Sequence, residues 1–239
     1  MDSSPRTPGN PVPAAPSWWA LWPDLLAFAG GLLLAWCFHW QVRDLVWSLW
    51  LSSLTVGYAM IVWAIVRPLV AAEAATSESV ADPAKRTLLQ GAWLVGALFT
   101  LGFFTVHFGM FHFVHSVFLN QFFPAVDGPA RGFPGFGVYW HVATTYWPFV
   151  LLAAVAERDR FRTTSAFVPL RGLRDGGKSG DPFAAPYKNV VRMHLMIFFF
   201  AFTSFAKLEN FSVYAVVYAV YFFPWRRVKP AITRPAAAA

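Results

Sequence analysis

The sequence predicts an all-α fold, a polytopic membrane protein with a bundle of about six transmembrane helices and both termini in the cytoplasm. Three observations predict this class. Hydrophobic residues make up 57% of the 239 residues, charged residues make up 13%, and the mean hydropathy is +0.47. Soluble domains carry about 25% charged residues. The chain is therefore too apolar for a water-soluble domain, and its 12 Trp and 25 Phe make it rich in aromatic residues.

The predicted elements are apolar runs that follow one another along the chain. They cover residues 18–38, 45–66, 88–123, 138–155, 190–206 and 211–225. Most of them approach the ~20 residues that a helix needs to cross ~30 Å of hydrocarbon. The third run is too long for a straight crossing. We therefore expect it to tilt, to bend at Gly102 or Gly109, or to project beyond the bilayer.

The segments outside these runs are polar or rich in proline. Residues 1–17 lack the basic cluster and apolar core of a signal peptide, and they are predicted to form a disordered tail. The six-helix transmembrane domain then spans residues 18–228, with a basic cytoplasmic loop at about 157–189. Residues 229–239 are predicted to form a cytoplasmic tail.

The positions of the basic residues predict the orientation. With six spans, the two tails, the segment 67–86 and the long basic loop share one side of the membrane. Of the 19 Lys and Arg residues, only Arg43, Arg131 and Lys207 fall on the other side. Lys and Arg accumulate on the cytoplasmic side, so both termini are predicted to be cytoplasmic. One alternative stays open, because residues 190–225 could form one bent helix instead of two.

Composition also excludes several classes of function. A single cysteine, Cys37, excludes a disulfide framework and a cysteine-based zinc site. The sequence contains no HExxH, GxSxG or glycine-rich phosphate loop that would predict a metalloprotease, a hydrolase or a nucleotide site. The net charge of +7 comes from the loops, so it is better explained by membrane orientation than by nucleic-acid binding. Histidine and carboxylate remain as ligand chemistry.

Three histidines, His107, His112 and His115, lie within the apolar and aromatic stretch 103–118. An ionisable group inside a membrane segment is costly and is a candidate for function. His112 and His115 are three residues apart and share a helix face, whereas eight residues separate His107 from His115, which is about 12 Å along the axis. His107 and His115 therefore cannot bind one metal ion in a straight helix.

Two kinds of cofactor site follow from this helix. A Zn²⁺ or Cu²⁺ site would need His112 and His115 plus a third ligand, for which we favour His141, with His39 or Asp127 as alternatives. A haem or chlorin would need only one axial histidine against aromatic walls. The alternative is that each histidine bonds a backbone carbonyl or lies in the polar interface of the membrane.

The segment VHFGMFHFVHSVF resembles a motif, roughly HYGxFxxVHxxF, of an uncharacterised family of prokaryotic multi-pass membrane proteins. The matching positions are His107, Gly109, Phe111, Val114 and His115. Weaker similarity includes Trp50 and Gly57 and, in PYKNVVRMHL, Tyr187 and His194.

The resemblance covers about half of the chain and implies the prokaryotic inner membrane as the location. It singles out His107, His115 and His194 as candidate cofactor-binding residues. The topology places His194 in the inner half of the bundle, near the face opposite His107. Ser52 and Ser53 stand where such proteins tend to carry a glutamate, which weakens the case for a carboxylate ligand there.

Three functions are consistent with the sequence. The first is a non-enzymatic membrane subunit or scaffold that contacts lipids and packs against partner subunits or a second copy, with aromatic faces that could also contact a pigment. The second is a histidine-based metal or haem protein with its site near the outer face. The third is a small proton-linked transporter that uses His107 and His115.

Overall fold

The computed structural model gives the helical architecture of most of the predicted membrane domain. It describes residues 18–79, 83–127, 132–163, 190–191, 194–200, 202, 211–224 and 228. The predicted tails at 1–17 and 229–239, most of the basic loop, and the break between the last two apolar runs lie outside these residues. Within the described residues the chain is helical and contains no strand.

The helices occur in the order of the predicted apolar runs. They are α1 (Trp18–Cys37), α2 (Val42–Ser79), α3 (Pro83–Phe122), α4 (Phe136–Ala156), α5 (Arg158–Thr163) and α8 (Phe211–Phe222). Residues 190–191 and 194–200 are also helical. The ends of α1 and α4 lie within two residues of the predicted ones.

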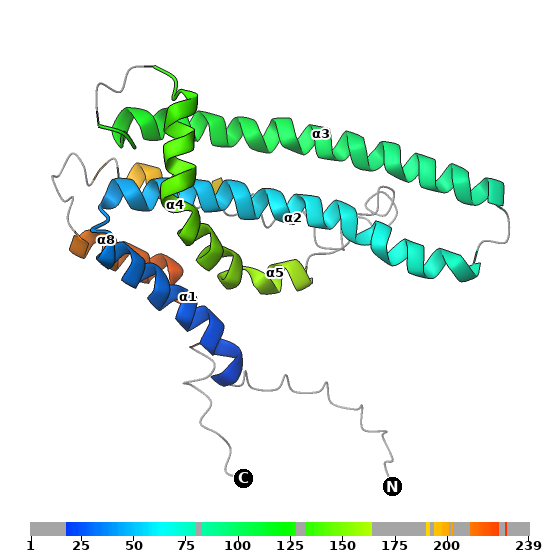
Figure 1. The fold of residues 1–239 in the computed structure, drawn as a ribbon, viewed down its shortest axis with the longest axis horizontal. Helices are drawn as coiled ribbons and strands as arrows, with labels where there is room; N and C mark the ends of the chain where they lie inside the picture. Colours follow the sequence, from blue (N-terminus) through cyan, green and yellow to red (C-terminus); the bar gives the residue numbers. More distant parts are fainter. Residues whose placement is uncertain are drawn as a thin grey trace, which may run out of the picture.

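Helix α2 is longer than predicted, so the prediction of a loop at 67–86 was wrong for most of that segment. It continues to Ser79, and α3 begins at Pro83. The added residues include the sequence AAEAATSES, which is too polar for a membrane run but rich in residues that favour helix. Helix α3 runs through Gly102 and Gly109 without a break. The ends of α2 and α3 that meet near residues 79–83 project together beyond the other helices (Figure 1).

Helix α2 is the centre of the fold. It packs against α3, α4 and α8, and α4 also packs against α1 and continues into α5. Figure 1 shows α2 and α3 side by side, whereas α4 crosses them steeply. The main core forms where these helices meet, around Trp47, Trp50, Tyr146 and Phe200.

A close helix contact positions α3 on α2. The ring of Phe108 from α3 is fully buried and lies over Gly57 of α2. A Cβ atom at Gly57 would lie 2.7 Å from the Cζ atom of Phe108. Only glycine therefore allows this approach, which sets the register of α3 and of its histidines.

Among the described residues, three helices are long and apolar enough to cross a membrane. They are Val42–Arg67 within α2, Gln90–Phe122 within α3, and Phe136–Ala156, which is α4. Leu21–Cys37 and Phe211–Val220 are shorter apolar helices. By length and composition, the described residues therefore support three crossings and do not support the six predicted.

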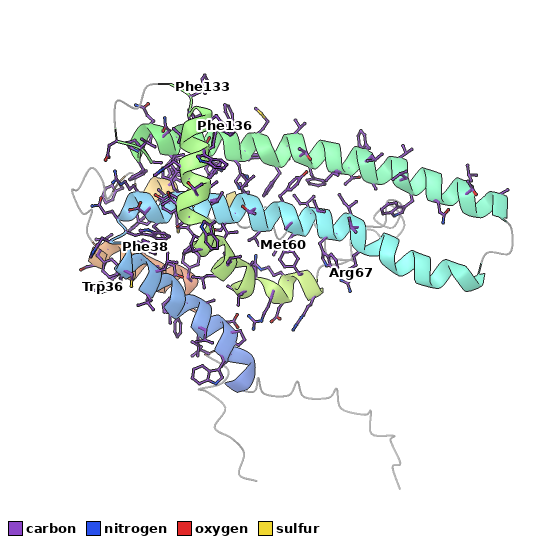
Figure 2. The ribbon with its side chains drawn as sticks, in the orientation of Figure 1. Trp36, Phe38, Met60, Arg67, Phe133 and Phe136 are labelled. Carbon is purple, nitrogen blue, oxygen red and sulfur yellow. The ribbon has the colours of Figure 1, made fainter. Side chains whose placement is uncertain are left out.

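A buried ion pair ties α1 to the junction of α4 and α5. Asp24 of α1 is only 7% exposed, and Arg158 Nη1 donates to its Oδ1 atom at 2.6 Å. The hydrogen bond to the Asp24 carboxylate raises the pKa of Arg158 above its ordinary value, so the guanidinium stays charged. Near the other end of α5, Trp63 of α2 donates to the carbonyl of Phe161, and Arg67 points towards this end of α5 (Figure 2).

Asp24→Asn should lower the free energy of unfolding by about 1–3 kcal/mol, because a charge-assisted hydrogen bond is lost while the guanidinium stays partly buried. The melting temperature of the purified chain in mild detergent would measure this loss. The matched control is Asp127→Asn, which breaks the solvent-exposed pair with Arg43. An exposed pair contributes about 0–1 kcal/mol. Equal losses in the two variants would contradict the structural role of the Asp24 pair.

Candidate histidine site

The candidate site lies on the face of α3 that packs against α2. Phe108, His112, His115 and Leu119 recur every three or four residues, and all four are buried. His112 is 1% exposed and His115 is 2% exposed. The helix therefore turns two of its three histidines into the bundle.

His112 has a hydrogen-bond partner at each ring nitrogen. Its Nδ1 atom lies 3.0 Å from the carbonyl oxygen of Phe108, and its Nε2 atom lies 3.2 Å from the Ser53 hydroxyl of α2. Because a carbonyl can only accept, neutral His112 carries its proton on Nδ1 and accepts from Ser53 at Nε2. Trp50 Nε1 donates to the carbonyl of His112 at 2.8 Å. These bonds make His112 an anchor between α2 and α3.

His115 is paired on one side only. Its Nε2 atom is hydrogen-bonded to Nδ1 of His194, and the two ring centroids are 4.1 Å apart with an interplanar angle of 74°. Its Nδ1 atom is buried and has no hydrogen-bond partner among the residues that the structure describes. His115 therefore combines complete burial with one free ring nitrogen, which His112 does not.

The two histidines belong to a line of polar contacts through the helix interfaces, which we call the polar seam. It consists of the pairs His112–Ser53, His115–His194 and Ser116–Tyr139, the last with 2.8 Å between the two hydroxyl oxygens. The indole of Trp50 stacks on Tyr139, with 5.8 Å between ring centroids, and closes the seam against α4. The seam thus joins α2, α3, α4 and the helical residues 194–200.

The structure brings together only two of the three histidines that were predicted to bind a cofactor. It brings His115 and His194 into contact, although the topology placed His194 in the opposite half of the bundle. His107 lies on the outward face of α3, where it stacks on Phe103 and meets the edge of Phe111, at centroid distances of 5.3 and 5.1 Å. The three histidines therefore do not form one site.

Of the predicted metal ligands, His112 and His115 are neighbours, with 6.3 Å between their ring centroids. In the part of the chain that the structure describes, no group of three or more His, Cys, Asp or Glu side chains is placed to hold a metal ion. His112, His115 and His141 are thus not gathered into one ligand set. Of the alternatives, His39 forms the turn between α1 and α2 with φ +52°, and Asp127 pairs with Arg43 at 2.9 Å. Histidine-bound metal stays a prediction.

The contact between His115 and His194 does not test the predicted haem or chlorin site, because that site needs only one axial histidine. The haem or chlorin site stays a prediction.

Residues 11–222 match the sequence profile of a family described as a family of unknown function, DUF6498. The chain belongs to this family. No match was found among curated proteins or solved structures.

The DUF6498 chain contains partners in the seam that sequence reasoning missed. Ser53 attracted attention only as a departure from the resembling motif, yet its hydroxyl binds His112. Ser116 and Tyr139 were not considered. A partial signal was present for Ser116, which follows His115 and is four residues from His112, so it shares their part of the helix face. No sequence signal identifies Tyr139, which comes from another helix.

Proposed function

We propose that the chain is a non-enzymatic subunit or scaffold of the prokaryotic inner membrane, with six spans and cytoplasmic termini, that packs through α3 against a partner membrane helix. The three long apolar helices support a membrane location. The six-span topology is supported by the Lys and Arg residues, most of which it would place on one side of the membrane. The partner is either another subunit or a second copy of the chain.

The proposed docking surface is the outward face of α3. In the most apolar 18-residue window of α3 only 11% of the residues are buried, compared with 56% in that of α2. Large apolar side chains stand along the side of α3 that faces away from α2 (Figure 2). The exposed members include Val95, Phe99, Val106, Met110 and Phe118. Lipid alone could cover such a face.

The observation that favours a protein partner over lipid is the position of His107. This histidine lies exposed on the same apolar face, between Phe103 and Phe111. Ionisable residues within membrane segments are expensive in hydrocarbon and almost always face protein or a water-filled cavity. Polar side chains between membrane helices also form hydrogen bonds that stabilise association. An exposed histidine on this face of α3 therefore supports a protein partner there.

Site-directed cross-linking in native membranes tests the docking surface. In a Cys37→Ser background, we expect Val106→Cys and Met110→Cys to form an intermolecular cross-link, because both positions face outward. The size of the product separates a second copy from a different subunit. Ala97→Cys is the control, because Ala97 is buried. Outward cysteines that form no cross-link and react at full rate with a lipid-soluble reagent would show that lipid covers α3.

A further inference from the structure

We propose that His115 and His194 form a proton-transfer pair, which accepts a proton at the buried Nδ1 atom of His115 and passes one on through His194. This activity goes beyond the scaffold role and uses the opposite side of α3. Chains of His, Asp and Glu are the usual proton relays within membrane proteins. Within the polar seam, this pair is the part whose hydrogen bonds leave a buried ring nitrogen without a partner among the described residues.

The hydrogen bond between the two rings can exist in two forms. In one, Nε2–H of His115 donates to Nδ1 of His194, and the Nδ1 lone pair of His115 is unpaired. In the other, Nδ1–H of His194 donates, and His115 carries an unpaired N–H at Nδ1. Each form leaves the same buried atom without a partner among the described residues. These contacts therefore do not lock His115 into one tautomer, whereas the Phe108 carbonyl locks His112.

The transfer step conserves protons and moves no electrons. A proton binds the lone pair on Nδ1 of His115, and the proton on Nε2 crosses to Nδ1 of His194. His194 then releases the proton from its own Nε2 atom to water or another acceptor that reaches its exposed side chain. One proton enters and one leaves. Both rings must reorient before the next transfer, so the passage should be slow compared with a water-filled pore.

The surroundings of the pair suit proton transfer better than ion binding. Among the residues that the structure describes, the ionisable groups that act on His115 are His194 and His112. Two hydroxyl groups also lie in the seam. Tyr139 of α4 is hydrogen-bonded to Ser116, and Ser53 of α2 is hydrogen-bonded to His112. Each of these neighbours is neutral or can be neutral near pH 7. No fixed negative charge among them would hold a metal cation or trap the transferred proton.

The test is proton flux into liposomes that contain the full chain and an internal pH-sensitive dye, driven by a potassium gradient with valinomycin. We expect flux above that of empty liposomes, and we expect His115→Phe and His194→Phe each to reduce it by about 10-fold or more, because the relay loses a proton carrier. The control is His39→Asn, which removes a histidine from the α1–α2 turn and tolerates its positive φ. Flux that is absent in the wild type, or equal in all variants, would overturn the proposal.

A second measurement uses the unmodified chain and does not depend on folding of the variants. In NMR spectra of the chain with ¹⁵N-labelled histidine, we expect two imidazole rings whose nitrogens exchange between protonated and unprotonated states. A pair fixed in a single tautomer at every pH would contradict the proposal. Cross-linking at Val106 and Met110 involves neither His115 nor His194, so the scaffold role and the proton transfer can fail independently.

Discussion

Trp50→Ala is expected to lower the free energy of unfolding by about 3–5 kcal/mol, the range for truncating a buried aromatic residue. Trp50 is 4% exposed and donates a hydrogen bond to the carbonyl of His112. Its ring also stacks on Tyr139 and meets the edge of Trp47 at 5.5 Å between centroids. Alanine would remove the contacts that hold three helices around the seam. Thermal or denaturant unfolding in mild detergent measures the loss.

Two controls separate packing from hydrogen bonding at this position. Trp50→Phe keeps an aromatic ring and removes the N–H donor, so we expect a loss of about 1 kcal/mol from the hydrogen bond. Trp140→Ala removes an indole that is 62% exposed on α4, and its effect should be small. If Trp50→Ala destabilised the chain no more than Trp140→Ala, Trp50 would not be a core residue of the fold.

Gly57→Leu is the second change with a large expected effect. The added Cβ would meet the Phe108 ring at 2.7 Å, and the rest of the leucine would have to displace a fully buried aromatic side chain. Overpacking of a core typically costs about 1–3 kcal/mol and occasionally more, and here it would also push α3 away from α2. We expect a lower melting temperature and a lower yield of monodisperse protein on size-exclusion chromatography.

A compensating change tests the cause. Phe108→Ala should restore part of the stability in the Gly57→Leu background, because it removes the ring that the leucine meets. Gly102→Leu is the matched control, because a Cβ at Gly102 meets no atom within 4 Å in the structure. If Gly102→Leu were as harmful as Gly57→Leu, the loss would reflect glycine itself and not the contact with Phe108.

Helix boundaries were predictable wherever hydropathy changes together with helix propensity. The N-terminal end of α1, which follows Pro16 and Ser17, shows that pattern. Helix α2 does not, because its apolar run ends near Val66 while Ala- and Glu-rich sequence continues the helix to Ser79. Hydropathy indicates which part of a helix suits hydrocarbon, and backbone hydrogen bonding continues as long as the residues favour it. The expected loop between α2 and α3 was therefore too long.

The candidate histidines could be found in the sequence, but not their roles. His107 and His115 match the resembling motif equally, yet one lies on the outward face and the other is buried. His112 was the favoured partner of His115 in a metal site, and in the fold it anchors α3 through Ser53. These differences depend on which side of α3 meets α2, and that is set by contacts such as Phe108 on Gly57.

The sequence by itself determined the helical class, the apolar runs and the helix that carries half of the histidines, because these properties depend on local composition. The tertiary structure alone decided which face of α3 is buried and which side chains meet across the polar seam. In a membrane helix both the lipid-facing and the core-facing sides are apolar, so hydrophobic pattern does not distinguish them. The partners of His112 and His115 lie 59 and 79 residues away in the chain, and only the packing of the helices brings them together.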